Sequence, residues 1–321
     1  MNMTGPHDNL LAQRRLGRSG IRVTGIGVGG SPIGLPALYG NAAAPDGAVA
    51  TVRRVLAGPI AFLDTSNCYG DSERYIGTAL ADTGGLPDGF VLATKVDADP
   101  LTGDFSGVRV RRSFAESRSR LGVDRFELLH LHDPENHISF ADAMRPGGPV
   151  EALRALRDEG LAGSIGIAGG TVSEMRRYVE SGAFDVLLTH SRLTLVDRSA
   201  CALVERASDL GLGVINAAPF GGGVLARRPR PDARYAYGLG SPQQVAAARR
   251  MHEAADEAGV PLAAAALRFA ATAAGVDAVL AGVSTPARID ELERLALMPI
   301  PPGLLEELDR LSPPAAAWIP R

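Results

Sequence analysis

Short apolar runs alternate along this chain with longer segments in which apolar residues recur at helical spacing. The runs are nearly continuously apolar, as in strands that are buried on both faces of a parallel sheet. Eight strands are predicted, at Gly25–Val28, Ile60–Asp64, Phe90–Lys95, Phe126–His132, Ser164–Ala168, Val186–Thr189, Gly213–Asn216 and Ala278–Ala281.

The segments between these runs carry the periodicity of amphipathic helices. Nine helices are predicted, at Ala48–Ala57, Ser72–Asp82, Val108–Leu121, Val150–Glu159, Val172–Ser181, Ser199–Leu210, Pro242–Gly259, Leu262–Ala274 and Arg288–Ala296. Eight strands separated by helices favour a closed α/β architecture, the (β/α)8 TIM barrel, over a doubly wound sheet. Because no segment has the composition of a domain linker, we expect one domain over residues 1–321.

Some parts of the chain fall outside these units. Residues Arg14–Val23 carry turn residues between two short runs and predict a β-hairpin that closes the bottom of the barrel. Residues Phe220–Gly240 form a long loop rich in glycine, proline and arginine, and loops of that length are usually functional or mobile. We expect residues 1–11 and 313–321 to be loosely held.

A glycine pattern near the start resembles a dinucleotide-binding fingerprint. Gly25, Gly27 and Gly30 satisfy GxGxxG, and Asp46 follows further along the chain. The fingerprint needs a helix that opens at the third glycine, and the next residues, SPIGLPALYG, are not expected to form one. We interpret the pattern as a turn after the first strand, which a barrel places at its active mouth.

Composition narrows the classes of protein. The chain of 321 residues is 45% hydrophobic and 21% charged, with a formal net charge of −3, so it can bury a large core and has no basic excess for nucleic acid. No apolar run approaches the length of a membrane span, and no apolar signal core opens the sequence, so we expect a cytoplasmic protein. Two cysteines, Cys68 and Cys201, predict neither a disulfide framework nor a metal cluster. These features argue against nucleic acid and membrane partners and leave the oligomeric state open.

Four polar residues lie at the ends of three successive predicted strands. Asp64 ends the second strand and Tyr69 lies in the turn after it, Lys95 ends the third strand, and His132 ends the fourth. In a parallel barrel the carboxyl ends of neighbouring strands converge on the face that holds the active site. We therefore expect these four side chains to lie together.

The four residue types form a coherent proton-transfer group. A free tyrosine has a pKa near ~10, and a neighbouring lysine ammonium is expected to lower that pKa by favouring the phenolate. A carboxylate beside the lysine would orient it, and a histidine can polarise a substrate oxygen. Together they can give a proton to a carbonyl oxygen or take one from a hydroxyl. The other half of such a redox reaction needs a nicotinamide cofactor.

The spacing of these residues is similar to the signature of the aldo-keto reductases. The matching segments are Asp64-Thr65-x-x-x-Tyr69-Gly70-x-Ser72-Glu73 followed by Gly77, the ATK that ends at Lys95, and LHLHDP around His132. The resemblance implies a (β/α)8 barrel that binds NAD or NADP without a Rossmann domain. It also implies Tyr69 as general acid/base, Lys95 and Asp64 as the pair that tunes it, and His132 as donor to the substrate oxygen.

Two histidines share this last segment, and only one fits the signature. His130 and His132 lie on the same face of a strand because side chains alternate with period two. The family places its histidine just before a residue-proline pair, which selects His132. His130 is then expected to be a buried neighbour inside the barrel.

The later strand ends depart from many members of the family. Gly169 and Gly170 stand where a Ser-Asn pair is common, His190 where a glutamine is common, and Ala217 near a usual stacking tyrosine. The segments HSRLTLVDR and INAAPFGGGVL look similar to the aldose 1-dehydrogenase branch, with its L-fucose and L-galactose dehydrogenases, and to pyridoxal 4-dehydrogenase. Both oxidise a cyclic hemiacetal to a lactone. The resemblance therefore implies oxidation of an aldose at C1, with pyridoxal as the alternative substrate.

The resemblance also implies cofactor and substrate contacts. The cofactor contacts are expected at Gly169, Gly170, His190, Asn216, Ala217, Ala218, Pro219, Phe220, Gly221, Ser284, Arg288 and Glu291. The substrate pocket is expected at Ser31, Tyr69, His132 and Phe220. The start of the last barrel helix suits a phosphate, and no lysine or arginine stands close to Ser284 to hold a 2′-phosphate. We therefore expect NAD, although Arg288 alone could accept NADP.

Two functions of other classes stay open. A metal-dependent barrel hydrolase would use ligands from His130, His132, Asp133, His190 and Asp64, but it leaves Tyr69 and Lys95 without a role. A non-catalytic subunit that senses the nicotinamide redox state is the other, and the intact group of four argues against it. The reductase hypothesis requires no bound metal ion.

Overall fold

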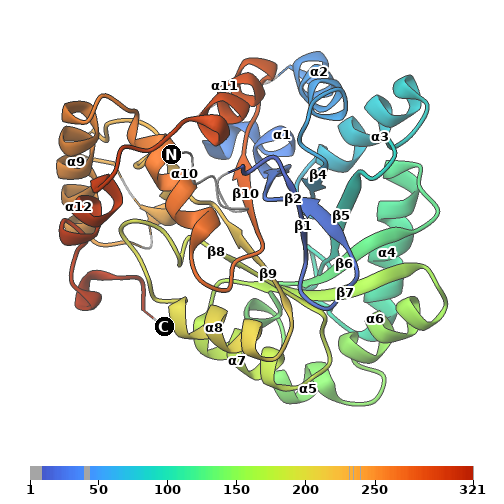
Figure 1. The fold of residues 1–321 in the computed structure, drawn as a ribbon. Helices are drawn as coiled ribbons and strands as arrows, with labels where there is room; N and C mark the ends of the chain where they lie inside the picture. Colours follow the sequence, from blue (N-terminus) through green and yellow to red (C-terminus); the bar gives the residue numbers. More distant parts are fainter. Residues whose placement is uncertain (1–8, 40–43, 231, 234, 239, 321) are drawn as a thin grey trace.

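Eight parallel strands form a closed barrel at the centre of the molecule (Figure 1). The structure is a computed structural model that describes residues 9–39, 44–230, 232–233, 235–238 and 240–320. The barrel strands are β3 (Ile26–Gly29), β4 (Phe62–Asp64), β5 (Val91–Val96), β6 (Phe126–His132), β7 (Ala162–Gly169), β8 (Val186–His190), β9 (Gly213–Ala217) and β10 (Ala278–Gly282). Pairing of β10 with β3, from Val279↔Ile26 to Gly282↔Gly29, closes the ring. The predicted (β/α)8 barrel is confirmed, and the doubly wound sheet is excluded.

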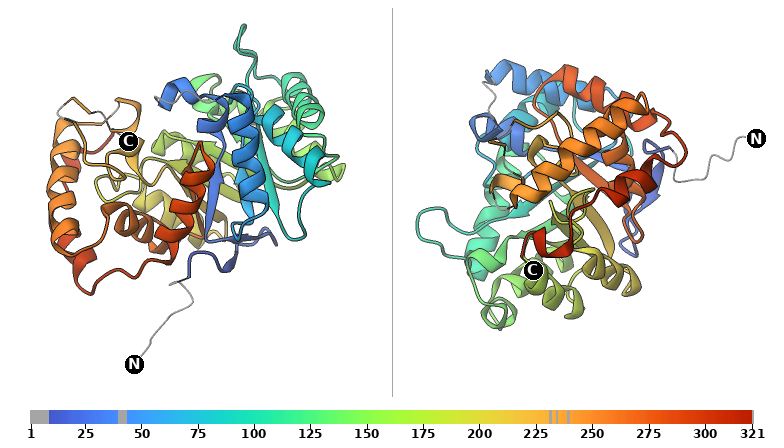
Figure 2. Two further views of the ribbon diagram at one scale, coloured as in Figure 1. Left: turned by 90° about the horizontal axis from the view of Figure 1, so that it is seen from above. Right: turned by 90° about the vertical axis from the view of Figure 1, so that its left-hand side faces the viewer.

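Helices cover the outside of the barrel (Figures 1 and 2). They are α1 (Ser31–Gly34), α2 (Pro45–Leu56), α3 (Ser72–Thr83), α4 (Gly107–Leu121), α5 (Phe140–Met144), α6 (Pro149–Asp158), α7 (Val172–Glu180), α8 (Cys201–Asp209), α9 (Pro242–Glu257), α10 (Leu262–Thr272), α11 (Pro286–Leu297) and α12 (Leu304–Arg310). Short 3-10 turns lie at Pro36–Tyr39, Pro134–Asn136, Gly221–Gly223, Ala236–Gly238 and Ala315–Ala317. The nine predicted helices are all present, and α9 and α12 pack side by side on one flank.

The hairpin predicted near the N-terminus is present and covers the amino ends of the barrel strands. β1 (Gln13–Arg15) pairs antiparallel with β2 (Arg22–Thr24). The turn between them lies against the start of β9, because a Cβ on Gly17 would be 2.2 Å from the amide nitrogen of Gly213. Gly17 also has a φ of +51°, so glycine is required there on both grounds. Its amide donates to Asp277 Oδ2 at 3.1 Å, just before β10.

The barrel interior changes from apolar to polar along its axis. Apolar side chains such as Phe62, Leu128 and Ile215 fill the lower part together with Leu16 from the hairpin. Nearer the carboxyl ends of the strands the buried residues include Lys95, which is fully shielded from solvent. A buried ammonium is costly without a charged partner, so the polar end of the barrel is where a functional group is expected.

A short helix follows the glycine pattern near the start of the chain. α1 begins directly after Gly30, so the prediction that this segment forms no helix was wrong. Pro32 stands at the start of α1, where a missing amide hydrogen costs nothing. Packing accounts for the second glycine of the pattern, because a Cβ on Gly27 would lie 2.6 Å from the Phe62 ring.

The two ends of the chain are held more firmly than predicted. Ile26 donates its amide to the carbonyl of Leu10 at 3.0 Å. Near the C-terminus, Ile319 donates its amide to Asp197 Oδ2 at 2.8 Å, and Ser241 Oγ donates to the carbonyl of Ala317 at 2.7 Å. These contacts contradict the expectation of loosely held ends for residues 9–11 and 313–320, whereas residues 1–8 and 321 lie outside the described residues.

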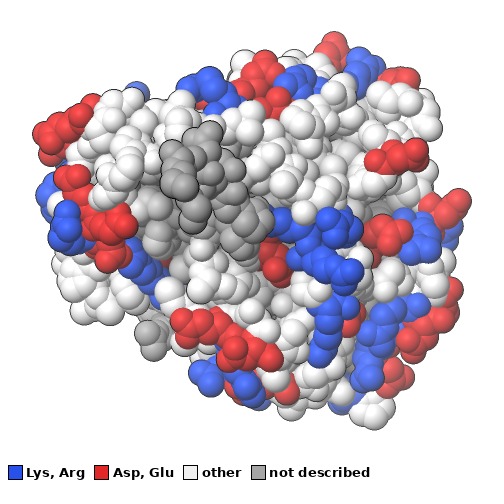
Figure 3. All heavy atoms as spheres, viewed as in Figure 1, with Lys and Arg blue, Asp and Glu red and all other residues white. Residues whose placement is uncertain are grey.

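The surface carries charges of both signs. On the face shown in Figure 3, lysine and arginine side chains lie interspersed with aspartate and glutamate. Among the described residues, no helix combines the length and the apolar character needed to cross a membrane.

Candidate active site

A buried ion pair links the carboxyl ends of β4 and β5. Lys95 Nζ donates to Asp64 Oδ1 at 2.5 Å and to the carbonyl of Thr65 at 2.6 Å. The two side chains are 0% and 5% exposed, so neither charge is compensated by water. Burial raises the pKa of Asp64 despite the opposing charge of Lys95. The pair therefore depends on mutual contact, as buried charges do.

Tyr69 lies against this pair from the loop after β4. Lys95 Nζ lies 4.6 Å from the centre of the tyrosine ring, and the ring meets the His132 imidazole edge-on at 5.6 Å between centroids. Burial, followed by the negative charge of Asp64, raises the pKa of Tyr69 well above its ordinary value of 10.0. The predicted lowering of that pKa by Lys95 was wrong, because burial and then the charge of Asp64 favour the neutral phenol. Tyr69 is therefore a neutral phenol that can donate a proton.

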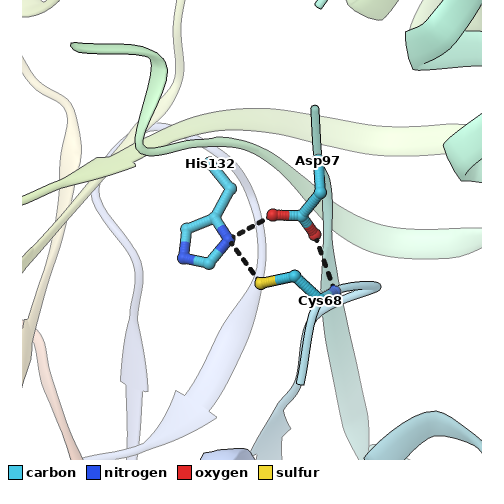
Figure 4. A group of neighbouring side chains, drawn as sticks. All are labelled: Cys68, Asp97 and His132. Atoms are coloured by element: carbon cyan, nitrogen blue, oxygen red, sulfur yellow. Dashed lines mark hydrogen bonds and ion pairs between the residues drawn. The ribbon is translucent and has the colours of Figure 1, made fainter. Parts of the chain in front are cut away.

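His132, at the end of β6, is held by a carboxylate that the sequence analysis missed. Asp97 Oδ1 lies 2.6 Å from His132 Nδ1, as Figure 4 shows. Asp97 Oδ2 in turn accepts from Ser66 Oγ at 2.6 Å and from the Cys68 amide at 3.1 Å. The signal was present in the sequence, since Asp97 comes two residues after Lys95 and strand side chains alternate with period two.

Charge decides the protonation of His132. Burial by itself lowers the pKa of this imidazole, but the negative charges of Asp97 and then Asp133 raise it well above the ordinary value of 6.5. An imidazolium has two N–H donors, of which Nδ1 faces Asp97. The second donor, Nε2, has Asp133 Oδ2 at 3.8 Å and is left to serve an incoming oxygen.

The residues proposed as zinc ligands of a hydrolase are not gathered into one site. Asp64 is bound by Lys95. His130 lies deeper in the barrel, fully buried, and a Cβ on Gly166 would be 2.2 Å from its Nδ1. Burial and then the charge of Lys95 lower the pKa of His130 well below its ordinary value, so it is neutral. His130 is an interior neighbour of the site, in agreement with the interpretation of the sequence.

Glycines replace side chains at the end of β7. A Cβ on Gly169 would lie 2.7 Å from Glu135 Oε1, and one on Gly170 would lie 2.9 Å from His190 Nε2. Glu135, which the sequence analysis missed, accepts from the amides of Gly170 at 2.8 Å and Thr171 at 3.0 Å. Asp133, Glu135, Gly170 and His190 help to line a small cavity of about 140 Å³. The two glycines thus present backbone beside a polar hollow at the barrel mouth.

The segment after β9 departs from its predicted role at two positions. Asn216 Nδ2 donates to the carbonyls of Leu193 at 2.8 Å and Ala270 at 3.4 Å, so its side chain faces the outer helices and does not support a cofactor contact. Phe220 is half-buried against the two apolar clusters outside the barrel, which does not support a place in the substrate pocket.

The residues on either side of Phe220 are arranged so that a ligand could approach their backbone closely. Ala217 packs against the interior cluster of the barrel, and Ala218 has a φ of 58°, which is unusual for a residue with a side chain. Pro219 is buried, and a Cβ on Gly221 would lie 2.1 Å from the ring of Tyr235. Residues 217–221 contribute no bulky side chain to the inner face of the barrel.

The loops after β10 and β3 meet at the opposite side of the mouth. A Cβ on Gly282 would be 2.9 Å from Pro32, one residue after the half-buried Ser31. Ser284 is buried, and α11 begins after Thr285, whose Oγ1 accepts from the Arg288 amide at 3.3 Å. The Arg288 guanidinium is half exposed and paired with Glu291. A helix start with a nearby arginine fits an anionic group such as a cofactor phosphate.

Known proteins are similar to this chain in sequence. A family model described as the Aldo/keto reductase family matches residues 25–312. L-Galactose dehydrogenase from Arabidopsis thaliana is 31% identical over 87% of this chain and 86% of its own length. D-Threo-aldose 1-dehydrogenase from a Pseudomonas species is 35% identical over 64% of this chain, and the match spans 62% of that relative. Pyridoxal 4-dehydrogenase from Microbacterium luteolum is 28% identical, covering 86% and 90% of the two chains.

Solved structures agree on the fold. An aldo-keto reductase from Bacillus halodurans in its holo form superposes with a TM-score of 0.77 at 22% sequence identity, covering 95% of this chain and 97% of its own. The family match extends over most of the chain and includes every strand of the barrel, whereas the hairpin of β1 and β2 lies before it. This chain therefore belongs to the aldo/keto reductase family, whose members are oxidoreductases that use NAD(P)H.

Proposed function

We propose that this protein oxidises a cyclic hemiacetal, such as an aldose, at C1 to a lactone, and catalyses the reverse carbonyl reduction. One observation carries the proposal. The Tyr69 ring lies over the buried Lys95–Asp64 pair and edge-on to His132, at the mouth of a barrel. This places a neutral acid, a fixed cation and a second proton donor within reach of a single substrate oxygen.

Each of the four residues has a defined task in the proposed reaction. In reduction Tyr69 gives its phenolic proton to the substrate oxygen. In oxidation the phenol first loses this proton to solvent, and the phenolate oxygen then takes the proton of the substrate hydroxyl, because one path serves both directions. Lys95, held by Asp64, stabilises negative charge on the phenol oxygen as the proton moves. His132 donates from Nε2 to the substrate oxygen while Asp97 holds Nδ1. The nicotinamide ring supplies the hydride acceptor or donor when it is bound.

The choice of a hemiacetal rests on relatives and on the shape of the mouth. The three relatives described above are named as dehydrogenases of D-threo-aldoses, L-galactose and pyridoxal. The strand ends that would face the nicotinamide carry Gly169, Gly170 and Ala217, so a ring-shaped substrate meets few side chains there. Pyridoxal is the second candidate, because it also closes to an internal hemiacetal and because the third relative spans 86% of this chain.

The cofactor would lie across the mouth, from the glycines after β7 to the start of α11. We favour NAD over NADP, because the guanidinium of Arg288 is already paired with Glu291. Within α11's first turn, from Pro286 to Ile289, Arg288 is the single basic side chain. A 2′-phosphate would therefore compete with Glu291 for the Arg288 guanidinium.

The test is a panel of aldoses and pyridoxal with NAD and NADP, followed by absorbance of the reduced cofactor. We expect oxidation of at least one free sugar or of pyridoxal, with a lactone as product by NMR. The methyl glycoside of the same sugar is the matched control, since it has no hydroxyl at C1 and must not react. Equal oxidation of the glycoside would refute the hemiacetal chemistry, and tight cofactor binding without any turnover would favour the sensor.

A further inference from the structure

Three side chains of different ligand chemistry meet beside the catalytic group. They are Cys68 after β4, Asp97 after β5 and His132 at the end of β6, as Figure 4 shows. One ligand atom from each lies within 4.8 Å of the other two. Cys68 Sγ is 3.6 Å from His132 Nδ1, and Asp97 Oδ1 is 2.6 Å from the same nitrogen. Three neighbouring strand ends therefore fix this cluster.

We infer that Cys68, Asp97 and His132 form a reversible binding site for Zn²⁺, and that zinc bound there inhibits the enzyme. Thiolate, imidazole and carboxylate are the three ligand types that zinc takes in proteins, and three protein ligands with an open fourth position are a common arrangement. A thiolate and an imidazole disfavour magnesium and calcium, which prefer oxygen ligands. The site differs from the ligand set of a barrel hydrolase, since it contains neither His130 nor His190.

The distances show what zinc must change. A tetrahedral ion with Zn–S of about 2.3 Å and Zn–N of about 2.0 Å sets sulfur and nitrogen about 3.5 Å apart. Cys68 Sγ and His132 Nδ1 already stand at 3.6 Å. The corresponding nitrogen–oxygen separation is about 3.4 Å, whereas Asp97 Oδ1 and His132 Nδ1 are 2.6 Å apart. Zinc therefore enters by replacing this hydrogen bond and the contact of Ser66 Oγ with the same nitrogen at 3.1 Å, with Asp97 and His132 moving apart.

Exposure and charge favour entry of a cation from one side. Cys68 is exposed, whereas Asp97 and His132 are buried beneath it. Asp133 Oδ2, 3.8 Å from His132 Nε2, adds a second carboxylate on the other nitrogen of the same imidazole. The nearby Lys95 ammonium is already held by Asp64 and Thr65. On binding, the thiol proton of Cys68 and the Nδ1 proton of His132 pass to solvent.

The inhibition, unlike the binding, rests on the proposed function. Zinc on Nδ1 takes the nitrogen through which Asp97 holds the imidazole, and it draws the ring toward Cys68. His132 then loses its place edge-on to Tyr69, and its Nε2 is no longer aimed at the substrate oxygen. The ion thereby disables one donor of the catalytic group without touching Tyr69, Lys95 or Asp64.

The binding test uses Co²⁺ as a spectroscopic replacement for zinc and needs no substrate. Titration of the full chain with CoCl₂ should produce a thiolate-to-cobalt charge-transfer band in the near ultraviolet, which equimolar ZnCl₂ removes. The band should be absent from Cys68→Ser and weakened in Asp97→Asn. Cys201→Ser is the matched control, since Cys201 is the other of the chain's two cysteines and lies at the start of α8. Absence of the band in the unmodified protein, or its persistence in Cys68→Ser, would overturn the site.

The second test measures turnover of the best substrate from the panel against ZnCl₂ in a buffer that does not chelate zinc. Cys68→Ser should need at least about tenfold more zinc for half-inhibition, because loss of a group that only orients a ligand already costs about 10- to 100-fold in metal affinity. Cys201→Ser should match the unmodified enzyme. Equal zinc sensitivity of all three proteins would refute the inhibitory role. Failure of every substrate would instead refute the proposed function, and the cobalt band would still decide the site.

Discussion

The two halves of the barrel mouth are built in different ways. At the ends of β4, β5 and β6, charged side chains hold one another, as in the pairs of Lys95 with Asp64 and of His132 with Asp97. At the ends of β7 and β9, Gly169, Gly170 and Ala217 leave backbone where side chains would stand. The first half carries the groups proposed for proton transfer, and the second borders a small cavity of about 140 Å³. The charged side chains are thus concentrated on one side of the barrel mouth, and the cavity lies on the other, which is called the spacious half below.

The second half is held in place by segments that are distant in the chain. Asp197, in the loop after β8, accepts from Gln244 Nε2 on α9 and from the amide of Ile319, both at 2.8 Å. Tyr235, fully buried in the long loop, donates its hydroxyl to the carbonyl of Ser191 at 2.6 Å. The space in this half therefore depends on long-range contacts, and the reactive half on neighbouring strands.

Replacing Tyr69 should have the largest effect on the reactive half. Tyr69→Phe keeps the ring over Lys95 and removes the phenolic oxygen that is proposed to exchange a proton with the substrate. General acid–base catalysis contributes about 10²- to 10⁴-fold, and we expect kcat to fall by about that factor, with cofactor affinity nearly unchanged by fluorescence titration. Tyr75→Phe on α3 is the matched control. Activity of Tyr69→Phe within tenfold of the parent would show that another group moves the proton.

Asp97→Asn tests whether the carboxylate tunes His132 as the structure indicates. The amide keeps the shape of the side chain but loses the charge that raises the pKa of the imidazole. Hydrogen bonds to charged groups are worth about 1.5–3 kcal/mol, which corresponds to a loss of about 10- to 150-fold in kcat. Steady-state kinetics should show this loss with little change in KM, and the exposed Asp88→Asn serves as control. A change confined to KM would place Asp97 in binding instead.

The same comparison explains which parts of the site the sequence could predict. Asp64, Tyr69, Lys95 and His132 were recognisable because each is a distinctive side chain at a strand end, and adjacent strands bring such ends together. Asp97 followed from the same alternation and was overlooked because it lies one residue beyond its strand. The direction of the Tyr69 pKa was not predictable, since it depends on burial and then on the charge of Asp64.

The spacious half resisted prediction for a different reason. Asn216 and Phe220 were expected at the cofactor, but their orientations are set by packing against α10 and the outer helices. Glu135, which caps the amides after β7, lies about 35 residues before them in the chain. Strand and helix positions follow from local periodicity, whereas these contacts depend on which distant segments meet.

Removing a long-range contact should weaken the spacious half without touching the chemistry. Asp197→Asn loses the charge that accepts from Ser199, Gln244 and Ile319. We expect the free energy of unfolding to fall by about 1.5–3 kcal/mol, the worth of a hydrogen bond to a charged group. Urea denaturation measures this, and kcat at low temperature should stay near that of the parent. Asp256→Asn, which removes only an exposed pair with Arg228, should change stability by less than about 1 kcal/mol.

The smallest expected effect concerns the far end of the spacious half, at the start of α11. Thr285→Arg adds a cation next to Arg288, and an exposed ion pair is worth about 0.2–1 kcal/mol. The ratio of kcat/KM for NADP to that for NAD should therefore rise by about 1.4- to 5-fold. The substitution also removes the Thr285 hydroxyl that caps the helix. Thr285→Ala loses the same cap without adding charge, so only a ratio that rises in the arginine variant and stays constant in the alanine variant supports recognition of the 2′-phosphate at this position.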